Sequence, residues 1–180
     1  MQLAGKLLVL FAAISLTFPI SAYSKSKTRA HTVQASLPSQ ISPPGEKVII
    51  VDPRIHRWGA YSSDGELIRS GMATAGGHWC KDIKRSCRTK TGTFRIFSLG
   101  NSGCKSRKYP LPRGGAPMPY CMFFNGGQGL HGSNQVFNGN GSHGCVRLHV
   151  DDARWIRFDF AEGPSDNNGF RGTKVIVRPY

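Results

Sequence analysis

The sequence has 180 residues, a length that suits one domain with one sizeable core rather than two. It contains 24 Lys and Arg against 10 Asp and Glu, a formal net charge of +14, and such a field attracts anionic partners. The basic residues form no motif of a known nucleic-acid-binding module, so DNA and RNA are not expected as partners. An anionic polymer of the cell envelope fits the charge better, although a merely solvated surface would carry it too.

Residues 1–24 have the pattern of a secretory signal peptide. Lys6 lies in a short basic region, residues 7–20 are almost wholly apolar, and Ala22 and Ser24 are the small residues that precede a cleavage site. The apolar run of about 14 residues is shorter than the ~20 of a spanning helix, which argues against an uncleaved membrane anchor. We therefore expect cleavage after Ser24, a periplasmic or secreted location, and no membrane span in the mature chain.

The rest of the chain is expected to form a lead-in followed by a domain that is mainly β. Residues 25–45 mix Ser, Thr, Pro and basic residues with little apolar content, which predicts a flexible linker before a domain at 46–180. A hairpin turn signal, Ser-Asp-Gly, lies at 63–65. Runs of β-branched, aromatic and alternating residues predict strands at 47–52, 57–61, 67–72, 94–97, 120–124, 129–131 and 173–178.

One segment near the C-terminus has the period of a helix. Residues 151–162 place Ala153, Ile156 and Phe160 on one face, which predicts the one short helix of this fold. Before it, residues 101–119 form a long loop rich in Gly, Pro and Arg, and loops of that length are usually functional or mobile. The expected helix caps are Asp151 or Asp152 at the start and Gly163 at the end.

Residues that carry chemistry gather in the segment 131–148, HGSNQVFNGNGSHGCVRL. A thiol is a poor nucleophile until it is deprotonated, and a neighbouring imidazole can serve it, so His131 or His143 could activate Cys145. Glycines beside a reactive residue leave backbone N–H groups free to meet a developing oxyanion. The segment therefore suits nucleophilic catalysis by a cysteine.

Two other roles for Cys145 stay open on the residues alone. The chain has five cysteines, an odd number, and a disulfide is the commonest fate of a cysteine in a secreted domain. A zinc site of Cys145 with His131, His143 and His149 is the other alternative, but this spacing matches no common structural zinc pattern.

Two motifs resemble the signature of the L,D-transpeptidase catalytic domain (YkuD type), namely HGS at 131–133 and SHGCVRL at 142–148. The resemblance covers about residues 46–180 and implies a β-sandwich-like catalytic fold. Its further matches are VIIVD at 48–52, TGTF at 91–94, DA at 152–153 and GTKV at 172–175.

The resemblance implies a role for each site residue. Cys145 would be the acylated nucleophile and His131 its general base, and Gly132 would orient His131 through its main-chain carbonyl. The amides of His143, Gly144 and Cys145 would form the oxyanion hole. The residues expected to contact substrate are Ser142 and Arg147.

The activity that the resemblance implies is acyl transfer on peptidoglycan stem peptides, through a thioester on Cys145 and with release of the terminal D-alanine. The acceptor amine would belong to another stem or to an anchored wall protein, and water in its place would give an L,D-carboxypeptidase. No metal or other cofactor is expected. A non-catalytic secreted protein that binds the wall or contacts a host is the rival hypothesis, and the complete set of Cys145, His131 and Gly132 argues against it.

The other four cysteines gain an interpretation once Cys145 is taken as a free thiol. They can pair in three ways, and the local choice joins Cys80 to Cys87 and Cys104 to Cys121. These pairs would fix two loops beside the active site. The long loop at 101–119 is not part of the common family pattern, and its role is left open.

Overall fold

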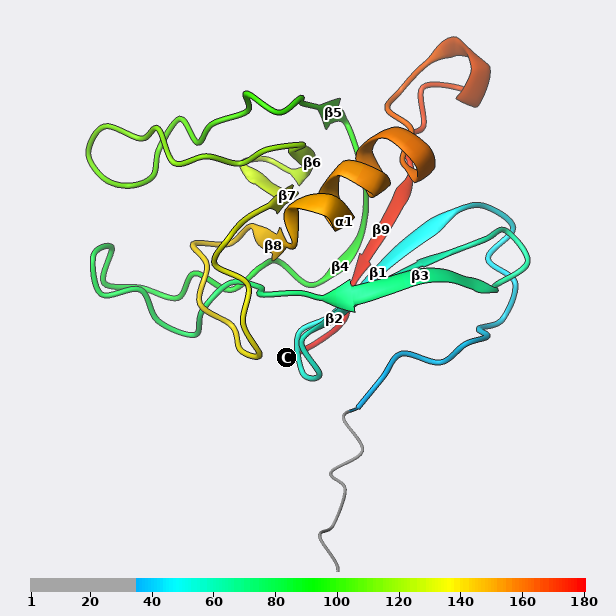
Figure 1. Cartoon of the computed structure of the whole chain (residues 1–180), viewed down its shortest axis with the longest axis horizontal. Coiled ribbons are helices and arrows are strands. Elements are labelled where there is room, and N and C mark those ends of the chain that lie inside the picture. Colours follow the sequence, from blue (N-terminus) through cyan, green and yellow to red (C-terminus); the bar gives the residue numbers. More distant parts are fainter. Residues whose placement is uncertain (1–34) are drawn as a thin grey trace, which may run out of the picture. The chain divides into compact units, whose positions relative to one another are not determined.

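A computed structural model describes residues 35–180, so the expected signal peptide at 1–24 and the first part of the expected linker lie outside the described residues. The described chain forms two β-sheets that share a core, with a short helix beside them (Figure 1). The larger sheet has the strand order β3-β2-β1-β9-β4 and the smaller sheet the order β5-β6-β7-β8. This architecture confirms the predicted fold class, mainly β with one short helix near the C-terminus. The strands are β1 (Val48–Asp52), β2 (Arg57–Tyr61), β3 (Leu67–Met72), β4 (Gly92–Arg95), β5 (Ser98–Leu99), β6 (Met122–Asn125), β7 (Gln128–Gly132), β8 (Val146–Leu148) and β9 (Lys174–Val177).

Strand β1 is buried on both faces, as its unbroken run of β-branched residues favours. Because side chains alternate along a strand, Ile49 and Val51 enter the core between the two sheets. Val48 and Ile50 point to the opposite face, where they join Leu37 in a second, smaller cluster. The larger sheet is therefore covered on each side.

Part of the expected flexible linker takes part in that second cluster. Leu37 is only 6% exposed, and the hydroxyl of Tyr61 donates a hydrogen bond to the carbonyl of Pro38 at 2.9 Å. Residues 35–45 were expected to be flexible because they contain few apolar residues. Leu37 and Ile41 of this segment nevertheless pack in the cluster, so the packed chain begins before residue 46.

The helix near the C-terminus is shorter than expected and changes its winding. It is α-helical as α1 (Val150–Trp155) and continues as one π-helical turn, η1 (Ile156–Phe160). The face predicted from the sequence is correct, because Ala153, Ile156 and Phe160 are all buried. A 3-10 turn, η2 (Asp166–Asn168), follows. Within residues 35–180, no helix is long and apolar enough to cross a membrane.

Both expected helix caps are wrong. The helix begins after His149, which makes no side-chain cap, and the π-helical turn already ends at Phe160. The carboxylate of Asp152 lies inside the first turn and pairs with Arg69 of β3 at 2.7 Å. This contact ties the helix to the larger sheet, and a residue committed to a tertiary ion pair is not available as a cap.

The smaller sheet holds the elements that matter for the site. β6 and β7 are antiparallel, whereas β7 and β8 are parallel. β8 was not expected as a strand, because its three residues, which lie within the motif at 142–148, are too few to show a strand period. The helix that follows it packs against β7.

Candidate active site

The pairing of β7 with β8 brings the two parts of the motif together. His131 lies opposite Arg147 in the register, and Leu130 lies opposite Val146. Leu130 and Val146 are fully buried in the core, so His131 and Arg147 must point to the other face. Cys145 stands two residues before Arg147 and, by the same alternation, is on the face of His131.

A cleft of about 1020 Å³ opens on this face. Cys145 and His131 both line it. Two stretches of the long loop, 104–109 and 116–119, form a large part of its wall, so the loop that the sequence left without a role is part of the site. Figure 1 shows this loop in light green beyond β5 and β6.

His131 is held as a neutral base. Its Nδ1 lies 2.9 Å from the carbonyl oxygen of Gly132, and since a carbonyl only accepts, Nδ1 carries the proton and donates. The other ring nitrogen, Nε2, is left with a lone pair. Burial lowers the pKa of His131 to about 4; the Gly132 carbonyl opposes this effect, and the positive charge of Arg147 adds to it. The imidazole is therefore uncharged at neutral pH.

Cys145 is held as a neutral thiol. It is half-buried, and it is the one cysteine of residues 35–180 outside a disulfide. Burial raises the pKa of the thiol, while the Gly129 amide and Arg147 lower it by less. Its Sγ donates to the carbonyl of Gly127 at 3.4 Å rather than to His131. Catalytic hydrogen bonds are often unmade before substrate binds, and this geometry is compatible with a thiol–imidazole pair.

This arrangement fits the family that the sequence resembles. Residues 46–177 match the sequence model of the YkuD family, the L,D-transpeptidase catalytic domain. The chain belongs to this family. No curated protein matches the chain.

Solved L,D-transpeptidases share the fold of this YkuD domain. One from Xylanimonas cellulosilytica is 22% identical with a TM-score of 0.58, over 77% of this chain and 63% of that chain. One from Stackebrandtia nassauensis is 22% identical with a TM-score of 0.55, over 81% and 63% of the two chains. A third, LdtMt1 in complex with imipenem, is 19% identical with a TM-score of 0.55, over 73% and 58%. The chain thus spans less than two thirds of these structures, and at such identities the likeness concerns the fold.

The loop that precedes Cys145 is held by hydrogen bonds between the side chain of Ser142 and the backbone of the same loop. Ser142 is 1% exposed, and its hydroxyl accepts from the Gly144 amide at 3.1 Å and donates to the Cys145 carbonyl. Ser142 lines the cleft, but this hydroxyl is engaged within the loop, and contact with substrate stays a prediction. Gly144 has a φ of +114°, and a Cβ there would lie 2.8 Å from Nε2 of Gln128. Of the three expected oxyanion donors, the Gly144 amide is thus occupied, and the other two are those of His143 and Cys145.

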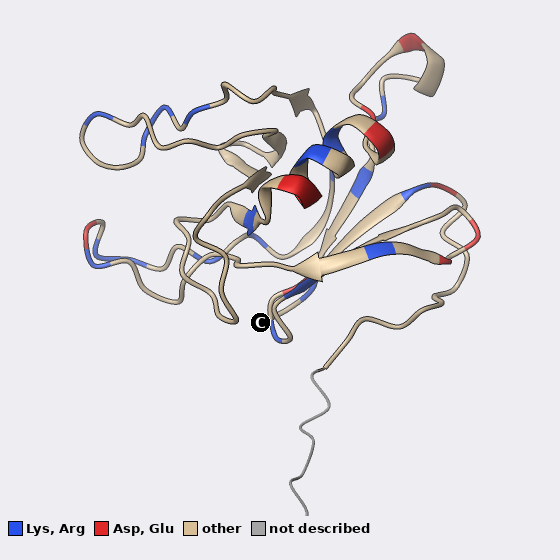
Figure 2. Ribbon diagram, viewed as in Figure 1, with Lys and Arg blue, Asp and Glu red and all other residues tan. Residues whose placement is uncertain are grey.

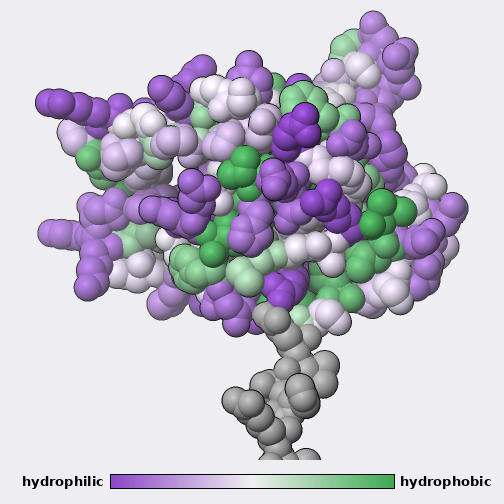
Figure 3. All heavy atoms as spheres, viewed as in Figure 1, coloured by the Kyte–Doolittle hydropathy of each residue, from purple (hydrophilic) through white to green (hydrophobic). Residues whose placement is uncertain are grey.

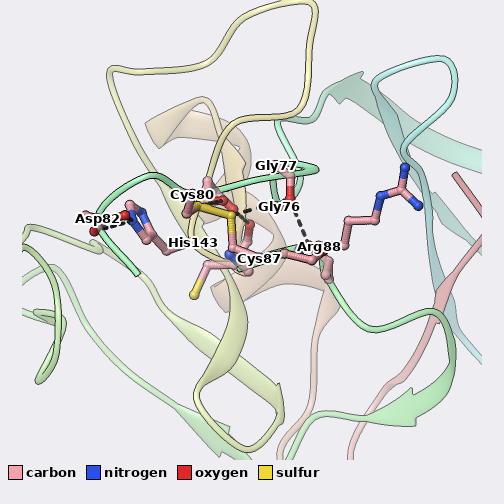
Figure 4. Close-up of a disulfide and its surroundings, with 12 residues drawn as sticks. Gly76, Gly77, Cys80, Asp82, Cys87, Arg88 and His143 are labelled. Carbon is pink, nitrogen blue, oxygen red and sulfur yellow. Dashed lines mark hydrogen bonds and ion pairs between the residues drawn. A yellow bond between two sulfur atoms is a disulfide. The ribbon is translucent and has the colours of Figure 1, made fainter. Parts of the chain in front are cut away.

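A disulfide loop packs directly beneath this loop of the YkuD domain. The amide of Gly77 donates to the carbonyl of Ser142 at 2.9 Å, so the chain after β3 pairs with the motif. A Cβ on Gly76 would lie 2.1 Å from the carbonyl oxygen of Cys87, which explains the need for glycine at this close approach. Cys87 is bonded to Cys80, and Figure 4 shows this disulfide beside the two glycines.

The remaining two cysteines, Cys104 and Cys121, form a disulfide across the long loop. The observed connectivity is the local one expected from the sequence. The zinc alternative of Cys145 with three histidines is not assembled. Among residues 35–180, one group of side chains places potential metal ligands close together, namely Cys80, Asp82 and His143. The sulfur of Cys80 is already bonded to Cys87, so it is not a free thiolate ligand.

The side chain of His143 joins both disulfide loops. Its Nε2 lies 2.8 and 2.9 Å from the carboxylate oxygens of Asp82, in the loop 80–87, and the two side chains point toward one another in Figure 4. The ring of Tyr109, in the long loop, lies 4.2 Å from the imidazole between centroids. The hydrogen bond to His143 lowers the pKa of Asp82, so this carboxylate is charged. Sequence reasoning gave no role to Asp82 or Tyr109, because no local pattern links them to a histidine so far along the chain.

Proposed function

We propose that this chain is a cysteine-dependent L,D-transpeptidase that acts on peptidoglycan stem peptides. The observation that carries the proposal is the placement of Cys145 and His131 on one face of two paired strands, within one cleft. The hydrogen bond between His131 Nδ1 and the Gly132 carbonyl supports it, because it leaves Nε2 free to accept a proton. Membership of the YkuD family supports the substrate class.

In the first half of the reaction, Cys145 attacks the carbonyl carbon of the amide between the third residue of the stem and its terminal D-alanine. The thiol turns from Gly127 toward His131 and gives its proton to Nε2 as the S–C bond forms. The developing oxyanion would accept hydrogen bonds from the His143 and Cys145 amides. The C–N bond then breaks, His131 returns the proton to the leaving amine, and D-alanine departs from a thioester.

In the second half, an amine replaces the peptide on sulfur. The acceptor amine attacks the thioester, His131 takes one of its protons, and the C–S bond breaks as the thiol of Cys145 is restored. An amine of another stem or of an anchored wall protein gives transpeptidation, whereas water gives the carboxypeptidase reaction. The chemistry uses a thiol, an imidazole and backbone amides, and it needs no cofactor.

Arg147 adds a fixed positive charge to this site. It lies opposite His131 in the register and lines the cleft, where we assign it contact with a carboxylate of the substrate. Its charge also opposes protonation of His131 and favours the thiolate of Cys145. Because the substrate is a wall peptide, the proposed place of action is the cell envelope, periplasmic or secreted, in agreement with the expected signal peptide at 1–24.

The proposal is tested with a purified stem tetrapeptide. The unmodified chain should release D-alanine and form a transient acyl adduct, and the Cys145→Ala variant should do neither. His131→Ala should lose turnover by about 10²- to 10⁴-fold, the usual contribution of a general base. His149→Ala, which changes an exposed histidine close to the motif, is the matched control and should keep its rate. Release of D-alanine by the Cys145→Ala variant would overturn the assignment.

Imipenem gives a second readout, since one of the solved L,D-transpeptidases is in complex with it. Incubation of the chain with imipenem should add the mass of one drug molecule to Cys145. A chain that binds wall peptides, releases no D-alanine and leaves Cys145 unmodified would instead be the non-catalytic wall-binding protein.

A further inference from the structure

The cleft is lined by positive charge on two sides. Lys105, Arg107 and Lys108 come from the long loop, Arg85 comes from the loop 80–87, and Arg147 comes from β8. No Asp or Glu of the described residues lines the cleft. We call Arg85, Lys105, Arg107 and Lys108 the cationic wall. Figure 2 shows these two loops, at the left of the view, with several Lys and Arg positions in blue.

The cationic wall has no counterions within residues 35–180. Elsewhere in the described chain, long cationic side chains lie against carboxylates, as Arg69, Arg95 and Arg178 do. None of the four side chains of the cationic wall is part of such an ion pair, although Arg85 is close in sequence to Asp82. Asp82 is engaged with His143 instead. The wall therefore keeps its charge available for a ligand.

The two loops that carry the cationic wall are also closed by disulfides and by backbone hydrogen bonds within each loop. The long loop is closed by the Cys104–Cys121 disulfide and by pairing of its two arms, where the Ser106 amide donates to the Ala116 carbonyl at 2.9 Å. The loop 80–87 is closed by its own disulfide, and both loops meet at His143. Figure 3 shows hydrophilic side chains projecting from this side of the molecule. Charges carried by constrained loops cost less to order on binding than charges on mobile loops, so the arrangement suits recognition rather than mere solubility.

We propose that the cationic wall is a carboxylate-recognition site that selects stem peptides by their free carboxylates. This inference rests on the proposed function for the identity of the ligand. A stem that ends in D-alanine carries a C-terminal carboxylate, and acidic residues earlier in the stem carry more. Arg guanidinium groups match a carboxylate in geometry as well as in charge, and lysine ammonium groups add point charges near it. Carboxylates held by the wall would orient the stem along the cleft, with its last amide at Cys145.

The test measures binding, with the Cys145→Ala variant so that no turnover interferes. One stem tetrapeptide is used with its carboxylates free, and the same peptide is used with its carboxylates amidated. The triple variant Lys105→Gln, Arg107→Gln, Lys108→Gln removes three charges from the wall. The matched control removes three exposed charges from the same two loops but outside the cleft, and consists of Lys81→Gln, Lys84→Gln and Arg113→Gln.

We expect the triple variant of the wall to bind the acidic peptide on the order of tenfold more weakly, since exposed ion pairs contribute about 1.5- to 5-fold each. The control triple should bind it within about twofold of the parent, because its three side chains do not line the cleft and salt screens charges that the ligand does not contact. The amidated peptide should bind the parent weakly, with no further loss in the variant of the wall. Equal losses in both triples would show a general field instead of a site, and equal affinity for the two peptides would also overturn the proposal.

The two proposals can fail separately. If the parent chain with Cys145 releases no D-alanine while the binding pattern holds, the transpeptidase reaction is refuted and the carboxylate site stands. If D-alanine is released at the same catalytic efficiency by the parent and by the triple variant of the wall, the carboxylate site is refuted and the reaction stands.

Discussion

The pKa of His131 gives the reaction a pH dependence that differs from that of an ordinary histidine base. The base is active as the neutral imidazole, so activity should fall only when the pH drops through the pKa of His131. Burial places that pKa at about 4, far below the 6.5 of a solvated imidazole. The thiol of Cys145, whose pKa is raised, stays protonated across the same range and needs the base throughout.

The size of the effect follows from these two values. At pH 5.5, an imidazole with a pKa of about 4 is roughly 97% neutral, whereas a solvated one is roughly 9% neutral. We therefore expect kcat/KM for D-alanine release at pH 5.5 to stay close to its value at pH 7, instead of falling about tenfold. The acid limb of the profile should have its midpoint near pH 4.

The assay is the initial rate of D-alanine release between about pH 3.5 and pH 8, at substrate concentrations well below KM. Circular dichroism at each pH must show a folded protein. The buried neutral His131 takes up a proton more readily in the unfolded chain, so stability declines as the pH falls from about 6.5 toward 4. An acid midpoint near 6.5 in a folded protein would refute the buried neutral base. A rate that rises tenfold per pH unit from 5 to 8 would refute proton removal by His131, since it would mean attack by thiolate formed beforehand.

Three further changes test the loop before Cys145 and the disulfide loop 80–87 that packs against it. Asp82→Ala removes the acceptor held by His143, so kcat for D-alanine release should fall more than KM rises, and Asp82→Asn, which keeps an acceptor oxygen, should restore most of it. Replacement of Cys80 and Cys87 by Ala should lower the free energy of unfolding by about 2 to 3 kcal/mol for a loop of this length, measured by urea denaturation. Gly144→Ala should reduce acylation of Cys145 by imipenem, measured by mass spectrometry, because a φ of +114° strains any residue with a Cβ. An unchanged acylation rate in that variant would contradict the assigned backbone geometry.

The residues that meet in the candidate site could be predicted because they lie in motifs that are local in sequence, whereas their catalytic roles stay a prediction. Cys145 lies between glycine and a β-branched residue in a short motif, and His131 is followed at once by the glycine whose carbonyl holds it. The strands with long β-branched or alternating runs could be predicted for the same reason. β8, with its three residues, is too short to show a period.

The features that could not be predicted depend on contacts between distant parts of the chain. Asp152 is an acceptable cap by residue type, but Arg69 from another strand takes its carboxylate. Leu37 and Ile41 are isolated apolar residues in a polar segment, and only the folded sheet provides the apolar surface that they cover. The meeting of Asp82 with His143 joins residues 61 positions apart and follows from two loops that no periodicity describes.

The raised pKa of Cys145 also bears on how this thiol persists beside two disulfides. Exchange between a thiol and a disulfide proceeds through the thiolate, so its rate falls with the fraction of thiol that is ionised. Burial keeps Cys145 protonated, and its Sγ donates to the carbonyl oxygen of Gly127, which cannot take the proton away. The same holds for oxidation, which also begins at the thiolate. Cys145 is thus protected from disulfide exchange and from oxidation for as long as its thiol stays protonated.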